Sequence, residues 1–267
     1  MRDLRIDDDI FFIKKDFYQD NSHMLKDVLI LSEDGFFNHF KYGNVNNISN
    51  HETWGIDFDF VIVGKEGWFE GLCEDFRSKL KEETIKNGDG FVCDDILLTR
   101  KTWKSLDFSI KEKFFKENDD DLVDINLDNI EGYEYLKKYH NIFPEIHGPN
   151  CFASVLYAIS RNEELINEWV FADSLLLFLQ ANGYEKIEDT GSQELIKPND
   201  VLIIYDDENP IHAVFCLNNK LCFNKFGQTM HELWSITSID WVISEFEGTL
   251  SIFRKKVIIY ENQYYIS

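Results

Sequence analysis

The sequence has no long apolar segment, and its basic residues are few. No window approaches about 18 uninterrupted apolar residues, so we expect no membrane-spanning helix. The first 17 residues carry Asp7, Asp8 and Asp9 where a signal peptide would need an apolar stretch, which predicts a cytoplasmic location. With 27 Lys and Arg against 49 Asp and Glu, the net charge is −22. This balance argues against a nucleic-acid partner.

Paired cysteine motifs are also absent. The chain has five cysteines, an odd number, and none forms a CxxC pair. Without an export signal, we expect reduced thiols in a cytosol and not a disulfide framework. The cysteines are Cys73, Cys93, Cys151, Cys216 and Cys222.

The composition nevertheless predicts a folded protein. Hydrophobic residues make up 44% of the 267 residues and aromatic residues 15%, enough for a substantial core and two modest domains. We predict a β-rich N-terminal domain of unknown role over residues 1–140, with strands near 27–31, 58–63 and 94–99 and a helix over 76–86. The acidic run at 117–121 is the candidate linker.

Residues 141–267 are better punctuated. Apolar residues at 152, 155, 156 and 159 predict a helix over 151–160, and further apolar helices follow over 163–180. The Pro198-Asn199-Asp200 turn then leads into predicted strands. Helices followed by an antiparallel meander indicate an α+β fold. The strands are expected over 201–205, 211–217, 221–224, 250–253 and 257–260.

Cys151 is the candidate nucleophile. If Asn150 caps the helix, Cys151 is its first residue, where free N–H groups and the positive end of the helix dipole favour a thiolate. The same N–H groups could form part of an oxyanion hole. The structural alternative is a small buried apolar residue, as many free cysteines are.

His212 is the candidate base. It is the one polar side chain in an otherwise apolar strand, and an imidazole near a thiolate serves as general base and acid. The alternative is a core histidine satisfied by a structural partner. His147 is a competing base, although four residues before Cys151 it is expected in the approach loop.

Asn224 is the candidate for the third group, which orients the imidazole. It follows His212 by 12 positions, across a turn near Asn218 and Asn219. A two-residue turn would place the two side chains on opposite faces. An odd loop centred on Asn218 would pair His212 directly with Asn224. A catalytic role for Asn224 therefore requires the odd loop.

These residues resemble the papain-like cysteine peptidase and amidase superfamily, nearest its NlpC-type branch. Lys197 to Ile203 is similar to the Pro-Gly-Asp turn before the histidine strand of that branch, with Asn199 in place of glycine. The resemblance covers about residues 145–260. It implies a Cys-bearing helix packed on an antiparallel sheet that bears the histidine. It also implies Cys151 as nucleophile, His212 as base and Asn224 as orienting group.

Two departures from the branch are visible. Residues 150–153 are Asn-Cys-Phe-Ala where the branch usually has Asp-Cys-Ser-Gly, and the third residue is asparagine where histidine is frequent. The side-chain half of the oxyanion hole stays open between Asn150, His147 and Tyr139. Enzymes of this branch that act on cell walls are usually exported, so the cell-wall substrate does not transfer to this chain.

Two functions from different classes follow. The first is a thiol hydrolase that cleaves an amide bond in a peptide or peptide-like substrate, or an acyltransferase with the same triad. The second is an acidic binding or immunity-type protein on an inactive scaffold, whose charge would steer a basic protein partner. A metal site of His212, Cys216, Cys222 and Asn224 has no standard zinc spacing. We therefore predict no metal and no cofactor.

Overall fold

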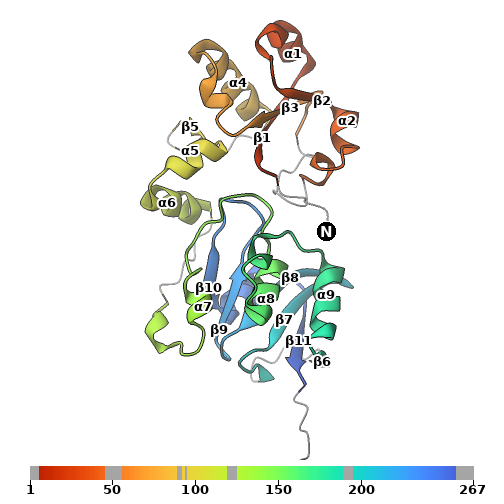
Figure 1. Cartoon of the computed structure of the whole chain (residues 1–267), viewed down its shortest axis with the longest axis vertical. Coiled ribbons are helices and arrows are strands. Elements are labelled where there is room, and N and C mark those ends of the chain that lie inside the picture. Colours follow the sequence, from red (N-terminus) through yellow and green to blue (C-terminus); the bar gives the residue numbers. More distant parts are fainter. Residues whose placement is uncertain are drawn as a thin grey trace, which may run out of the picture.

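The computed structural model describes residues 6–45, 56–88, 92–93, 95–118, 125–188 and 195–256. It is a mixed α+β protein with antiparallel sheets, as the sequence predicts. Figure 1 shows the N-terminal elements, red to yellow-green, gathered above the green to blue C-terminal elements. Within these ranges no helix is both long and apolar enough to cross a membrane. The predicted strand at 257–260 lies outside the described residues.

The N-terminal part is built on a three-stranded antiparallel sheet in the order β1-β3-β2. Its edge strand β1 is buried on both faces, because Ile10 and Phe12 pack into one core while Phe11 and Ile13 pack into another. The described residues hold more helix than strand here, so the prediction of a β-rich region is wrong. The strands are β1 (Asp8–Ile13), β2 (Leu29–Ser32), β3 (Phe60–Lys65), β4 (Val92–Cys93) and β5 (Ile96–Leu97). The helices are α1 (Lys15–Asn21), α2 (Glu33–Phe37), α4 (Glu74–Lys86), α5 (Arg100–Ser105) and α6 (Phe108–Asn118).

The C-terminal part is a six-stranded antiparallel sheet, ordered β10-β9-β8-β7-β11-β6, with a helix layer on each face. The apolar helix α8 lies across the face that carries Ala213 and Phe215 (Figure 1). Helix α10 covers the face that carries Val214 and Cys216. The helices are α7 (Glu134–Lys137), α8 (Cys151–Ser160), α9 (Ala172–Ala181) and α10 (Ile239–Glu245). The strands are β6 (Tyr184–Glu188), β7 (Val201–Asp206), β8 (Asn209–Cys216), β9 (Leu221–Lys225), β10 (Trp234–Ser238) and β11 (Thr249–Lys255).

The two parts are joined by specific contacts. Ile6 forms a β-bridge with His147, and the buried Arg100 guanidinium donates to the carbonyls of Ile6 at 3.1 Å and Glu145 at 3.3 Å. Trp103 on α5 packs into a cluster that includes Met230 from the C-terminal part. The predicted acidic linker begins inside α6, and its residues 119–121 lie outside the described ranges.

Candidate functional site

Cys151 is the first residue of α8, as the sequence predicts. The Asn150 side chain caps the helix, because its Oδ1 accepts the backbone N–H of Ala153 at 3.0 Å. The Asn150 amide also donates to the Val170 carbonyl at 2.8 Å, which ties the helix start to the segment before α9. The cap therefore holds Cys151 in one place against the sheet.

The thiol lies in a buried environment. Cys151 is 9% exposed, and burial raises the pKa of its thiol to about 11. The backbone N–H groups of Ala213 and Phe152 and the charge of Lys225 favour the thiolate, but their effect on the pKa is smaller than that of burial. Desolvation of the charged form therefore opposes the thiolate that is expected at the helix N-terminus.

The β8–β9 hairpin has the odd loop that the catalytic interpretation required. Cys216 pairs with Cys222, and the Leu217 N–H donates to the Leu221 carbonyl at 2.8 Å, which leaves residues 218–220 as a three-residue loop. The loop is centred on Asn219 and not on Asn218. The same register, continued along the strands, sets Asn224 opposite Val214 and not opposite His212.

His212 lies away from Cys151. Its ring stacks on Phe246 at 3.9 Å between centroids, and Phe246 packs against the core under α10, on the sheet face opposite α8. Ala213, the next residue, faces α8 and the thiol. Burial alone lowers the pKa of His212 to about 3, so its imidazole is neutral at physiological pH.

Asn224 does not orient the imidazole. It is fully buried, its amide lies beside the Cys222 thiol, and its Oδ1 and Nδ2 make no hydrogen bond to His212. The His212 Nε2 is buried without a partner. In the described part of the chain, no hydrogen bond joins His212 to Cys151 or to Asn224. The structure therefore does not bring the three predicted site residues together.

A buried lysine lies near the thiol, and sequence reasoning missed it. Lys225 has no exposed surface, and its Nζ donates to the carbonyls of Gly227 at 2.7 Å and Thr229 at 2.8 Å. Burial lowers the pKa of Lys225 to about 8, while Glu232 and Cys151 oppose that shift. The sequence feature that could have revealed it is a lysine at the end of an apolar strand. The correct hairpin register places it opposite Ala213, on the face of the thiol.

The residues left open for the oxyanion hole have structural roles. The Tyr139 hydroxyl donates to Glu163, and the Asn150 amide is used as described above. His147 lies in the approach loop as predicted, where its Nδ1 accepts the backbone N–H of Met230 at 3.2 Å. The His147 and His231 rings pack nearly perpendicular to each other, with 5.5 Å between their centroids.

The four residues weighed for a metal site do share one face of the sheet. His212 and Cys216 are separated by about 13 Å along β8, at roughly 3.3 Å per residue, which is too far for one ion. Across the described ranges, no three His, Cys, Asp or Glu side chains are grouped so that they could hold a metal ion.

Comparisons with known proteins add no relative. The chain matches no protein-family model, no curated protein sequence and no solved structure.

Proposed function

We propose that the C-terminal part is a papain-like scaffold without working catalytic machinery, and that the protein binds a basic protein partner. A cysteine-bearing helix packed on an antiparallel sheet supports the scaffold, as does the Pro198-Asn199-Asp200 turn that opens β7. Cys151 and His212 lie apart, which argues against turnover by a triad. The observation that carries the binding role is a net charge of −22 on a chain whose thiol is buried.

Part of this charge is concentrated at one end of the six-stranded sheet. The pairing of Tyr205 with Thr249 brings the β7–β8 turn beside the loop that precedes β11. Five exposed carboxylates lie on these two loops or on the element ends that lead into them, since Asp206 ends β7 and Glu245 ends α10. None of the five forms an ion pair with a described residue. We call this set the acidic end: Asp206, Asp207, Glu208, Glu245 and Glu247.

Electrostatic steering gives the acidic end a measurable role. Unpaired surface carboxylates raise the association rate of a positively charged partner, and the effect falls as salt increases. The partner expected here is a folded protein with a basic surface, because the charge of the chain would repel an acidic one.

The test compares two variants of equal charge. One carries amides at all five positions of the acidic end, and the control carries amides at five exposed carboxylates elsewhere. Association with cytochrome c, used as a folded basic probe, is measured by stopped flow at low salt. We expect the first variant to slow association about tenfold or more and the control to slow it much less. The control positions are Asp20, Glu82, Asp128, Glu131 and Glu164.

Two results would contradict this proposal. Equal slowing in both variants would show that only the total charge acts and that the acidic end is no binding surface. Absence of association with the unchanged protein at low salt would remove the binding role altogether.

A second candidate function is amide hydrolysis or acyl transfer in which the Cys151 thiol is the nucleophile and His212 takes no part. It is favoured by the Ala213 and Phe152 N–H groups beside the sulfur and by Lys225, whose pKa of about 8 suits a base. In this scheme the neutral amine of Lys225 accepts the thiol proton, and the sulfur attacks the amide carbonyl. Lys225 then returns the proton to the departing amine as the C–N bond breaks. Water in hydrolysis, or another nucleophile in acyl transfer, finally releases the acyl group from Cys151. Turnover of peptide amides that is lost in Cys151→Ala and kept in His212→Ala would support it. No turnover by the unchanged protein would exclude it.

A further inference from the structure

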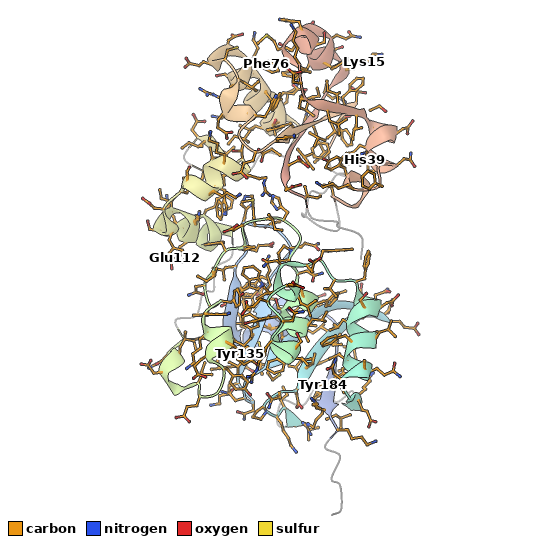
Figure 2. All side chains as sticks on the ribbon, viewed as in Figure 1. Lys15, His39, Phe76, Glu112, Tyr135 and Tyr184 are labelled. Carbon is orange, nitrogen blue, oxygen red and sulfur yellow. The ribbon has the colours of Figure 1, made fainter. Side chains whose placement is uncertain are left out.

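A cavity lies at the end of α8 opposite Cys151. Its volume is about 520 Å³, within the range of small-molecule sites. It is bounded by the end of α8, by the turn that opens β7 and by the end of β11. Cys151 is about 15 Å away along the helix, so this cavity is separate from the thiol. Figure 2 labels Tyr135 and Tyr184, two of its aromatic lining residues, in the C-terminal part.

The charge of this cavity is opposite to that of the chain. Acids outnumber bases by 49 to 27 in the whole sequence, yet the cavity lining includes five cations and a single carboxylate. That carboxylate, Asp200, is only 1% exposed. The cations are Arg161, Lys197, Arg254, Lys255 and Lys256.

Asp200 is fully used in holding Arg254. Its Oδ1 accepts Arg254 Nε at 2.8 Å and its Oδ2 accepts Nη2 at 2.6 Å, a two-pronged ion pair that fixes the guanidinium. The Lys197 backbone N–H donates to the same Oδ2 at 2.8 Å. Asp200 therefore positions one cation and forms no ion pair with the other four.

Three of the cations have no carboxylate partner among the described residues. Lys256 pairs with Glu185 at 3.1 Å, whereas no ion pair involves Arg161, Lys197 or Lys255. The Arg161 guanidinium lies 4.4 Å from the centre of the Tyr135 ring, an arrangement that holds its charge at the cavity wall. Unpaired cations in one concavity repel one another, and an anion between them would remove that repulsion.

We propose that this cavity binds a small multivalent anion that carries phosphate or carboxylate groups. Arg161, Lys197 and Lys255 supply the unpaired charge, and Arg254, held by Asp200, supplies a fixed guanidinium. The acids elsewhere on the chain weaken the attraction little, because charges beyond about 10 Å are screened at moderate salt. This inference does not depend on the proposed binding role of the acidic end.

The test is isothermal titration calorimetry with pyrophosphate in one arm and citrate in the other, at an ionic strength of about 0.1 M. The double variant Arg161→Gln/Lys255→Gln should weaken binding of the preferred anion about tenfold or more. The matched control is Lys15→Gln/Lys26→Gln, which removes two exposed cations of the N-terminal part. It should bind like the unchanged protein. Thermal unfolding of all variants confirms that each is folded.

Each outcome decides the proposal. Binding of pyrophosphate alone assigns a phosphate ligand, and binding of citrate alone assigns a carboxylate ligand. No heat with either anion up to about 5 mM overturns the proposal. An equal loss in the control variant also overturns it, since the effect would then come from total charge.

Discussion

The reactivity of Cys151 is decided by the few atoms around its sulfur. Because burial raises its pKa to about 11, the thiol is almost entirely protonated at pH 7. Cys73 is exposed, so iodoacetamide should reach it first. Per-site labelling of the native protein, followed by mass spectrometry, should show Cys73 modified well before Cys151 at pH 7. The opposite order would restore the activated thiol that the sequence predicted.

A buried carboxyl group in the N-terminal part makes stability depend on pH. Asp9 Oδ1 accepts the backbone N–H of Arg100 at 2.8 Å, while its Oδ2 is buried without a partner. Burial raises the pKa of Asp9 to about 7, the Arg100 N–H opposes this shift, and the charges of Glu70 and Glu66 add to it. The charged form is therefore disfavoured in the folded state.

The sign of the effect follows from linkage. The pKa of Asp9 in the folded state lies above its unfolded value of 3.8. The contribution of protonated Asp9 to the free energy of unfolding is therefore fully present below pH 3.8 and is lost as pH rises through about 7. The full shift corresponds to about 4 kcal/mol. Asp9→Asn should remove most of the decline in unfolding free energy between pH 5 and pH 8, measured by urea denaturation. A decline of the same size in Asp9→Asn would assign it to other groups.

At the scale of elements, the cap of α8 is worth more than an ordinary surface cap. Asn150 Oδ1 accepts from Ala153 at 3.0 Å and from Val170 at 3.4 Å, and its amide donates to the Val170 carbonyl. All of these groups are buried, so Asn150→Ala leaves them unsatisfied. We expect a loss of about 2 kcal/mol in the free energy of unfolding.

Asn162→Ala is the matched control for the cap. Asn162 Oδ1 accepts the Glu164 N–H at 3.1 Å in an exposed turn, where water can replace it. Its substitution should cost less than about 1 kcal/mol. Equal losses in the two variants, measured by urea denaturation, would mean that the burial of the α8 cap adds nothing.

At the scale of the whole molecule, Trp103 links the N-terminal and C-terminal parts. Its ring is 1% exposed and meets Phe143 at 5.2 Å and His231 at 4.6 Å between centroids, both from the C-terminal part. Trp103→Ala removes a large buried side chain, with an expected cost of about 3–5 kcal/mol. Scanning calorimetry should show one transition in the unchanged protein and two in the variant.

Trp241→Ala separates this effect from a general loss of stability. Trp241 packs on Phe226 at 4.5 Å between centroids, entirely within the C-terminal part. Its substitution should lower the melting temperature without dividing the transition. Two transitions already present in the unchanged protein would mean that the contacts across Trp103 do not couple the two parts.

Patterns of neighbouring residues are enough to predict the local structure around the site. The apolar stripe after Asn150 predicts α8 with Cys151 as its first residue, and short apolar runs between turns predict β7, β8, β9 and β11. The strands β6 and β10 were not predicted. The sequence left the hairpin loop open between two residues and an odd number, and the three-residue loop is held by Asn218, whose Oδ1 accepts the backbone N–H groups of Lys220 and Leu221 at 2.8 Å. These features depend on neighbours within a few positions of the chain.

Whether these residues meet depends on how the elements pack together. A shift of the loop centre from Asn218 to Asn219 moved Asn224 opposite Val214, a change in pairing that local sequence does not specify. Phe246, which follows α10, stacks on the ring of His212 on the sheet face opposite α8. Desolvation raised the pKa of Cys151 and lowered that of Lys225, because burial depends on every element packed around a group and not on its own segment.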